Sequence, residues 1–415
     1  MRTAVVVGSG AREHAIAWGL RRDDVLVTVT PGNSGMAADG FHCTTASPVD
    51  LDADLFVIGP EVPLVAGLAD TLRRQGKDVF GPGADGAQLE GSKAFLKKFL
   101  ADANVATASF GTFRDVDEAI HFLRAMTPPY VIKTDGLAAG KGVLVTDSLA
   151  DAEADVRDKL SGAAFGPAGT TIVIEEGLHG DECSLLVLTD GQRVVPLIPA
   201  RDFKRVGDND EGPNTGGMGA FAPLEVPRAT LEKTMVSILE PTMRELRRRG
   251  IDYRGVLYAG LMVTADGPKL LEYNVRFGDP ETEVIVPLLA ERFFECLRDA
   301  ARGHLAEGPR FSGKACVTVV LAARGYPHNP EVGDLISGLG NDGQLAERME
   351  DVVIFHAGTS RNSDGEFVTA GGRVLMVTAT GPSVLDARRR AYDAVGQISF
   401  DGMVMRTDIA QKGSL

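Results

Sequence analysis

The architecture of this chain is indicated most clearly by one stretch, Tyr130-Val-Ile-Lys-Thr-Asp-Gly-Leu-Ala-Ala-Gly-Lys-Gly-Val-Leu-Val-Thr146. Apolar runs at 130–134 and 143–146 predict two strands, and the turn between them is rich in glycine. Its spacing is not that of a Walker A motif, and it joins two strands instead of opening a helix. Such a hairpin can fold its N–H groups over a polyphosphate, with Lys133 projecting as a point charge. The alternative is a flexible surface hairpin; three glycines around Lys141 favour phosphate binding.

A second predicted strand carries oxygen ligands and a cation. Period-two alternation in Lys269–Arg276 puts Glu272, Asn274 and Arg276 on one face. Glu272 and Asn274 suit Mg²⁺, which takes a few protein oxygens together with phosphate oxygens and water. Arg276 can bind a carboxylate or a phosphoryl group in transfer. The alternative is a salt-bridged edge strand, but the abrupt turn at Phe277-Gly-Asp-Pro-Glu281 adds two carboxylates and favours a site.

Two polar segments are candidates for holding a nucleoside and a second substrate. Ile174-Glu-Glu-Gly-Leu178 and Gly180-Asp-Glu182 place an apolar strand end beside carboxylates, which suits an adenine slot with ribose hydroxyls bound by Glu182. Taken alone, acidic residues at a strand end are usually just solvated. The loop at 201–219 has too many glycines and charges for buried core. It is either disordered or a substrate-binding loop that orders on contact with anionic ligands.

The first hundred residues predict a parallel α/β unit. Apolar runs at Thr3–Val7, Leu26–Val29 and Leu55–Ile58 end in turn residues. Gly8-Ser-Gly-Ala-Arg-Glu-His14 begins like a dinucleotide fingerprint, but Glu13 stands where the third glycine is needed, and the second strand lacks an acid for the ribose. The motif therefore predicts either a helix N-terminus with free N–H groups for one phosphate or a plain tight turn, with equal weight.

Further elements follow from capping and periodicity. Ser92 caps a predicted helix, Ser383 caps the closing helix, and a polar loop precedes a helix at 231–249. Additional strands are predicted at 171–175, 255–263, 269–275, 315–322, 352–355 and 373–378.

Length, charge and composition exclude several classes of protein. With 415 residues, two to four packed units are expected. The 43 basic and 57 acidic side chains leave a net charge of −14, which disfavours nucleic acid as a partner. Four scattered cysteines indicate neither a zinc site nor a disulfide framework. Since no apolar run reaches membrane-spanning length and no signal peptide is evident, we expect a cytoplasmic protein without a membrane partner.

Together these motifs resemble the phosphoribosylamine-glycine ligase (glycinamide ribonucleotide synthetase) family of ATP-grasp enzymes in de novo purine synthesis. The resemblance covers the whole chain, and Arg276-Phe-Gly-Asp-Pro-Glu281 is its most specific string. The other motifs that carry it are Gly-x-Gly-x-Arg-Glu-His at 8–14, Pro31-Gly-Asn33, Gly59-Pro-Glu61, Glu90-Gly-Ser-Lys93, the 135–142 turn, Lys204-Arg-Val-Gly-Asp208, Gly212-Pro-Asn-Thr-Gly-Gly-Met-Gly219, Phe355-His-Ala-Gly-Thr359 and Gly371-Gly-Arg-Val374. Ala11, Phe203 and Val275 depart from the residues common in the family, and none of them is an assigned ligand.

The resemblance implies an α/β (α+β overall) ATP-grasp fold with an N-terminal parallel α/β domain and a C-terminal α/β cap domain. It implies a phosphoribosylamine-binding domain at 1–101, an ATP-grasp domain at 102–312 with a lid subdomain at about 121–185, and a C-terminal domain at 313–415. We expect small-molecule substrates and a monomer, with a weak homodimer as the alternative.

The resemblance also implies a division of the site. Lys93, Lys133 and Arg276 would be catalytic, and Glu272 and Asn274 would hold Mg²⁺ or Mn²⁺. The residues implied to contact ATP are Lys93, Lys133, Gly136, Gly140, Lys141, Gly142, Glu175, Glu176, Leu178 and Glu182. Those implied to contact glycine or phosphoribosylamine are Gly8, Gly10, Arg12, Glu13, Asn33, Glu61, Asp202, Lys204, Asn214, Thr215, Gly216, Gly217, Met218 and Arg276.

The expected reaction uses ATP to convert the glycine carboxylate into glycyl phosphate, which the amine of phosphoribosylamine then attacks. Three rival functions differ in what they turn over. A related ATP-grasp enzyme would phosphorylate bicarbonate, a nucleotide sensor would bind ATP without forming ADP, and a Rossmann oxidoreductase would bind a nicotinamide cofactor. The incomplete glycine fingerprint already weighs against the last of these.

Overall fold

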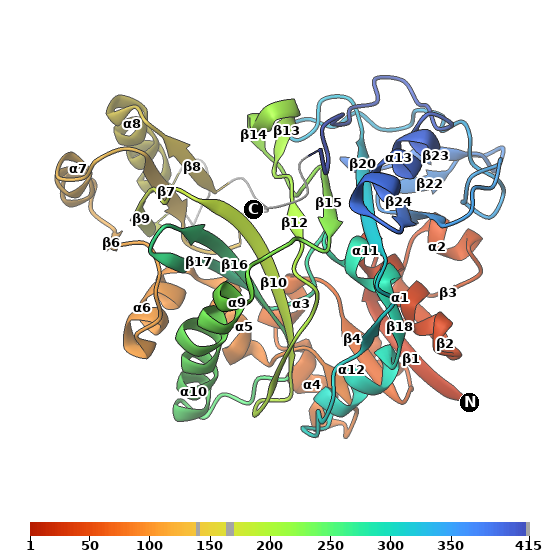
Figure 1. The fold of residues 1–415 in the computed structure, drawn as a ribbon, viewed down its shortest axis with the longest axis horizontal. Helices are drawn as coiled ribbons and strands as arrows, with labels where there is room; N and C mark the ends of the chain where they lie inside the picture. Colours follow the sequence, from red (N-terminus) through yellow and green to blue (C-terminus); the bar gives the residue numbers. More distant parts are fainter. Residues whose placement is uncertain (138–141, 163–169, 412–415) are drawn as a thin grey trace.

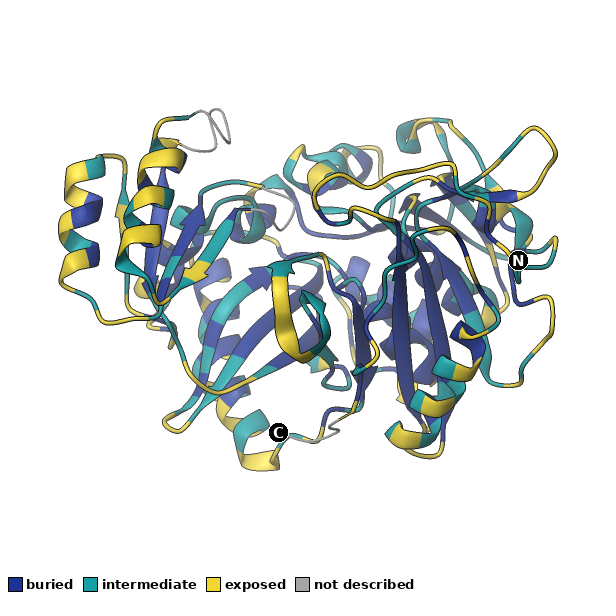
Figure 2. Cartoon of the chain, turned by 90° about the horizontal axis from the view of Figure 1, so that it is seen from above, coloured by how far each residue is buried: buried dark blue, intermediate teal, exposed yellow. Residues whose placement is uncertain are grey.

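The computed structural model describes residues 1–137, 142–162 and 170–411. Figure 1 shows an N-terminal α/β unit in red and a C-terminal unit in blue on one side, with a small sheet module standing apart at the other end. Figure 2 shows buried residues concentrated along the strands, while the outer helix faces are exposed. Within the described residues, no helix is both long enough and apolar enough to cross a bilayer.

The N-terminal unit is parallel and α/β, as the sequence predicts, and its strands have the order β3-β2-β1-β4-β5. Its strands read as continuous apolar runs because helices and later segments cover both faces. The strands are β1 (Arg2–Gly8), β2 (Val25–Pro31), β3 (His42–Cys43), β4 (Leu55–Ile58) and β5 (Val79–Phe80). The helices are α1 (Ala11–Arg22), α2 (Ser34–Ala38), α3 (Glu61–Val65), α4 (Leu68–Arg74) and α5 (Ala84–Gly91). The strand order reverses between β1 and β4, which is where ligands bind in open α/β sheets.

The small sheet module (residues 110–176) has its own apolar core, which includes Ile120, Leu123, Ile132 and Ile174. The two strands of the glycine-rich hairpin are confirmed, whereas the third strand begins at Ile172, one residue later than predicted. The order is β6-β9-β7-β8. The strands are β6 (Phe110–Phe113), β7 (Tyr130–Thr134), β8 (Val143–Thr146) and β9 (Ile172–Glu176), and the helices are α7 (Val116–Arg124) and α8 (Leu149–Leu160).

A second antiparallel sheet, in the order β11-β10-β16-β17, lies beside this module. Its strands are β10 (Asp181–Thr189), β11 (Val194–Pro196), β16 (Gly255–Thr264) and β17 (Gly267–Asn274). The predicted helix at 231–249 is present as α9 (Arg228–Thr234), a π-helical turn (Met235–Leu239) and α10 (Glu240–Arg248). Helix α6 (Lys93–Ala103) begins after Ser92, whose side chain accepts a hydrogen bond from the Phe95 N–H, so the predicted cap is confirmed.

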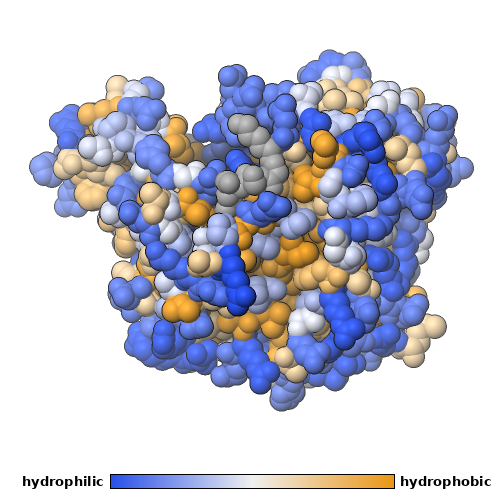
Figure 3. All heavy atoms as spheres, viewed as in Figure 1, coloured by the Kyte–Doolittle hydropathy of each residue, from blue (hydrophilic) through white to orange (hydrophobic). Residues whose placement is uncertain are grey.

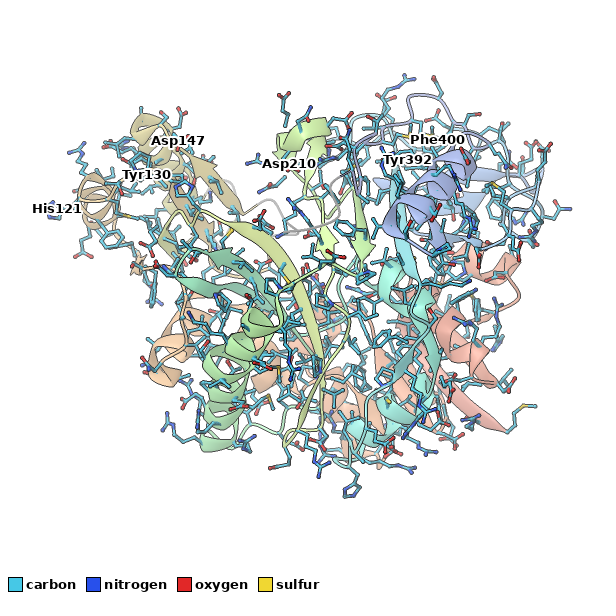
Figure 4. The ribbon with its side chains drawn as sticks, in the orientation of Figure 1. His121, Tyr130, Asp147, Asp210, Tyr392 and Phe400 are labelled. Carbon is cyan, nitrogen blue, oxygen red and sulfur yellow. The ribbon has the colours of Figure 1, made fainter. Side chains whose placement is uncertain are left out.

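The segment at 201–219 is not the disordered loop that its composition allows. It contains β12 (Arg201–Asp202), a hairpin of β13 (Arg205–Gly207) and β14 (Glu211–Asn214), and then β15 (Gly219–Ala222). The buried Arg406 guanidinium stabilises the hairpin, since it donates 2.7 Å to Asp210 Oδ1 and 3.2 Å to the Arg205 carbonyl. Figure 4 shows Asp210 on this hairpin, between the small sheet module and the C-terminal unit.

The C-terminal unit shares a sheet with the middle of the chain, in the order β12-β15-β20-β24-β21. The three predicted strands and the closing helix are confirmed, and the Ser383 hydroxyl accepts from the Asp386 N–H. The remaining elements are α11 (Thr282–Ile285), β18 (Leu289–Glu291), α12 (Phe293–Ala301), β19 (Arg310–Phe311), β20 (Ala315–Ala322), β21 (Val352–His356), β22 (Thr359–Arg361), β23 (Phe367–Thr369), β24 (Arg373–Gly381) and α13 (Val384–Val395).

Candidate active site

The predicted site residues gather around one cavity of about 930 Å³, which is lined by all the units described above. Figure 3 shows the surface hollowed beside the small sheet module. The volume is within the range of small-molecule and cofactor sites. The predicted residues that line the cavity are Arg12, Glu61, Lys93, Lys133, Gly142, Glu175, Glu176, Leu178, Glu182, Asp202, Lys204, Asn214, Thr215, Gly216, Glu272, Asn274 and Arg276.

Several predicted residues do not line this cavity. Gly140 and Lys141 lie outside the described residues. Asn33 caps α2, because its Oδ1 accepts from the Met36 N–H at 2.9 Å and its Nδ2 donates to two carbonyls. Met218 is fully buried, and Gly217 lies against Pro280. The other predicted residues that do not line it are Gly8, Gly10, Glu13 and Gly136.

In the N-terminal motif, one N–H group is bound within the chain, and phosphate binding by the helix end stays a prediction. The Glu13 carboxylate turns back and accepts from the Gly10 N–H at 2.7 Å, so this N–H is not free. A Cβ at Gly59 would lie 2.1 Å from Glu13 Oε1, and one at Gly8 would lie 2.5 Å from Glu13 Cγ. These glycines therefore make room for a buried glutamate, and the contact of Glu13 with the Arg12 guanidinium at 2.5 Å directs that arginine near the cavity.

Lys133 lies on β7 and faces β9, where its Nζ is 2.8 Å from Glu175 Oε1. Antiparallel pairing of the two strands brings these side chains together. A second lysine, Lys97 of α6, lies 2.8 Å from Glu175 Oε2. In this structure the Glu175 side chain forms ion pairs with two lysines, and its role in holding a nucleoside stays a prediction. Lys93, at the start of α6, reaches the Gly136 carbonyl at 3.4 Å.

The two predicted metal ligands, Glu272 and Asn274, both line the cavity. A bulge in the β16–β17 pairing precedes Glu272, and Asn274 Oδ1 accepts from the Arg276 guanidinium at 3.1 Å. Although burial acts to raise it, the pKa of Glu272 is lowered by Lys204 and by the further cations Lys133, Lys93 and Arg276. An ionised carboxylate and an amide oxygen beside a cavity fit a hard divalent cation that completes its coordination with phosphate oxygens and water. The described residues contain no cluster of three or more His, Cys, Asp or Glu side chains for a metal held by protein alone.

Arg276 is held between two carboxylates from the N-terminal unit. Its guanidinium lies 2.9 Å from Glu90 Oε1 and 3.3 Å from Glu61 Oε2. Burial acts to lower the pKa of Arg276, but the two glutamates raise it, so the guanidinium remains charged. Glu90 also accepts from the Val275 N–H at 2.8 Å. No role for Glu90 was predicted from the sequence.

The residues predicted for the second substrate form a compact group of charges. Lys204 Nζ lies 2.6 Å from Glu182 Oε2 and 4.0 Å from Asp202 Oδ1. Glu182, which lines the cavity and pairs with Lys204, stays the predicted contact for ribose hydroxyls. Burial raises the pKa of Asp202 to about 7, while Lys204 acts in the opposite direction.

Two further residues of the cavity wall, Arg373 and Glu281, received no specific role from the sequence. Arg373, from the start of β24, lies 2.9 Å from Asp279 Oδ2 and donates to the Gly216 carbonyl at 2.5 Å. Its motif, Gly371-Gly-Arg-Val374, was noted for the resemblance without a site role. Glu281 accepts from the Tyr258 hydroxyl at 2.5 Å and from Ser184 at 3.0 Å inside the wall.

Comparison with known proteins agrees with this geometry along the whole chain. Family models of phosphoribosylglycinamide synthetase match as the N domain at residues 2–90, the ATP-grasp (A) domain at 91–282 and the C domain at 316–412. The phosphoribosylamine-glycine ligase of Escherichia coli O157:H7 is 46% identical over 421 residues, covering 98% of this chain and 97% of that protein. The Streptomyces coelicolor protein of the same name is 46% identical over 425 residues, covering 99% of each.

Solved structures give the same result. The crystal structure of phosphoribosylamine-glycine ligase from Thermotoga maritima has a TM-score of 0.85 and 38% identity, covering 98% of this chain and 100% of that one. The biotin carboxylase domain of Hydrogenobacter thermophilus 2-oxoglutarate carboxylase, solved with MgADP and bicarbonate, has a TM-score of 0.72 at 16% identity, covers 97% of this chain and 91% of that one, and shows a shared fold. This chain is a member of the phosphoribosylglycinamide synthetase family and has its ATP-grasp fold.

Proposed function

We propose that this chain ligates glycine to 5-phosphoribosylamine, forming glycinamide ribonucleotide, ADP and phosphate in purine biosynthesis. The observation that carries the proposal is the arrangement of Lys93, Lys133, Glu272, Asn274 and Arg276 around one cavity. This set provides cations for a triphosphate, oxygen ligands for a metal and a guanidinium for a carboxylate. Relatives named phosphoribosylamine-glycine ligase match nearly the full chain at 42–46% identity.

The nucleotide fits best on the side of the cavity formed by the small sheet module and β17. Lys93 and Lys133 supply positive charge there, and Leu178 with the apolar ends of neighbouring strands supplies a slot for a base. We propose the small sheet module as the lid of an ATP-grasp domain at about 102–312, between an N-terminal domain at 1–101 and a C-terminal domain at 313–415. A closed lid is required because an acyl phosphate hydrolyses in open water.

Glu272 and Asn274 are the proposed metal ligands. A Mg²⁺ or Mn²⁺ ion there supplies charge that stabilises the phosphate oxygens during transfer. The cations around Glu272 keep its carboxylate ionised, and Arg276 fixes the orientation of the Asn274 amide.

The proposed chemistry has two steps, phosphoryl transfer and then amide formation. A carboxylate oxygen of glycine attacks the γ-phosphorus of ATP, the bond to the ADP oxygen breaks, and glycyl phosphate forms. The amine of phosphoribosylamine then attacks the glycyl carbonyl, expels inorganic phosphate and loses one proton. Lys133, Lys93 and Arg276 stabilise charge on the group in transfer. Lys204, Asp202 and the segment at 214–216 bind the glycine and amine side of the cavity.

A coupled assay for ADP tests the proposal. With freshly made phosphoribosylamine, omission of either glycine or phosphoribosylamine is expected to abolish turnover. Bicarbonate in place of glycine serves as the control for the related ATP-grasp reaction. ADP formation that depends on bicarbonate but not on glycine refutes the proposal, as does ATP binding with no ADP formed under any substrate combination.

A further inference from the structure

One buried carboxylate beside the cavity is shared by two lysines. Glu175 contacts Lys97 Nζ through Oε2 and Lys133 Nζ through Oε1, each at 2.8 Å. The side chains of Lys97, Glu175 and Lys133 are 1%, 2% and 9% exposed. Two cations thus share one carboxylate in a place that water scarcely reaches, and the more distant Glu176 and Glu272 carboxylates also act on Lys97 and Lys133, respectively. An arrangement with two buried lysines on one carboxylate is costly, and it invites a functional explanation.

The two lysines are held differently. Lys97 does not line the cavity, and its Nζ donates at 2.8 Å to Thr107 Oγ1, which in turn donates to the Leu270 carbonyl at 2.7 Å. Lys133 lines the cavity, and its contact with the Leu271 carbonyl is long, at 3.3 Å. Lys97 is therefore anchored away from the ligand space, whereas Lys133 is able to turn into it.

The electrostatics favour this division of roles. If Lys133 left Glu175 for a phosphate, and Lys97 were absent, the carboxylate would be buried without a cation, which is strongly unfavourable. The pKa of Lys97 is lowered to about 8 by burial and by the nearby Lys133, with Glu175 acting against both. Movement of Lys133 away from Glu175 relieves that repulsion and stabilises the charged form of Lys97.

We propose that Lys97 is a positioning residue for the ligase reaction, which retains Glu175 as its partner so that Lys133 can transfer from Glu175 to the phosphates of ATP. The inference rests on the proposed function, because it takes Lys133 as a phosphate contact. Helix α6 links Lys97 to the hairpin that follows Lys133. The helix carries Lys97, and at its N-terminus Ser92 Oγ and the Ala94 N–H donate to Asp135, at the base of that hairpin.

The test compares four variants by the kcat and the KM for ATP of folded enzyme. Lys97→Met is expected to raise the KM for ATP and lower kcat/KM by about one to two orders of magnitude, because Glu175 then retains Lys133. In Lys97→Met/Glu175→Gln the competing carboxylate is gone, so kcat/KM is expected within about threefold of that of Glu175→Gln alone. Lys98→Met is the matched control, since Lys98 is the next residue on α6 and its side chain is 76% exposed.

A merely structural role for Lys97 predicts a different pattern. It would reduce the yield of folded protein or the melting temperature, leave the KM for ATP unchanged, and give no rescue by Glu175→Gln. Unchanged KM in Lys97→Met, or losses that multiply in the double variant, would overturn the inference. If Lys97→Met does not fold, the comparison of the double variant with Glu175→Gln decides the question. Failure of the wild-type enzyme to form ADP refutes the proposed function instead.

Discussion

Replacement of Lys133 by methionine separates catalysis from stability in this site. Lys133 Nζ lies 2.8 Å from Glu175, and a phosphate oxygen at a similar distance would interact by about 6 kcal/mol at an effective dielectric constant of about 20. Most of this is offset by the Glu175 contact that is lost on transfer. A net effect of about 1–4 kcal/mol remains, which corresponds to a loss of about one to three orders of magnitude in kcat.

Stability is expected to change much less. After Lys133→Met, Glu175 keeps Lys97 at 2.8 Å, so no buried carboxylate is left without a cation. We therefore expect a shift in melting temperature of at most a few degrees, about the effect of 1 kcal/mol. Both quantities are measured on the same preparation, by ADP formation with saturating glycine and phosphoribosylamine and by thermal unfolding. Wild-type turnover in Lys133→Met refutes the phosphate role, and a collapse in melting temperature refutes the argument that Lys97 suffices for Glu175.

Three further predictions concern the metal pair, the hairpin and the interface of the N- and C-terminal units. Glu272→Gln should raise the Mg²⁺ concentration for half-maximal ADP formation by about tenfold or more, and an unchanged Mg²⁺ titration would exclude Glu272 as a ligand. Arg406→Met should lower the free energy of unfolding in urea by about 1–3 kcal/mol. The loss is moderate because Arg406 is buried but its partner Asp210 is largely exposed and stays solvated without it. An unchanged free energy of unfolding would show that other contacts stabilise the hairpin. Burial lowers the pKa of His356 from 6.5 to about 3, so its contribution to stability is present above pH 6.5 and is lost as pH falls toward 3, by up to about 5 kcal/mol. His356→Gln should show a smaller fall in unfolding free energy over that range, and an equal slope would contradict the assignment.

The strands were predictable because buried strands require runs of apolar residues, which are visible in the sequence. The runs 55–58, 130–134, 143–146 and 315–322 are strands with the predicted bounds, since they are apolar and end at turn residues. The folded hairpin within 201–219 was not predictable in the same way, because it is stabilised by contacts with Arg406, which lies near the far end of the chain. Local composition carries no signal for such a contact.

Site residues were predictable where the two-residue alternation of a strand puts them on the same face. The alternation predicted for 269–276 put Asn274 and Arg276 on one face, and the Arg276 guanidinium does donate to Asn274 Oδ1 at 3.1 Å, although β17 itself ends at Asn274. It could not show that Asn33 would be used to cap a helix, or that the Glu13 carboxylate would bind the Gly10 N–H. For Lys97, the local signal of burial is its position on α6, four residues after Lys93 and among apolar residues.

Four cations of the cavity share one property that bears on how it binds ligands. Each of Lys133, Lys204, Arg276 and Arg373 lies within 3 Å of a carboxylate oxygen. An anionic ligand that binds one of these four must therefore exchange with a carboxylate, and the strength of that contact is set by the difference between the two partners. Lys93 differs from them, since it contacts the Gly136 carbonyl. Where the carboxylate has a second permanent cation, as Glu175 has Lys97, this exchange leaves no unpaired charge behind. Lys133 is thus better suited than a singly paired lysine to bind the triphosphate and then to release ADP.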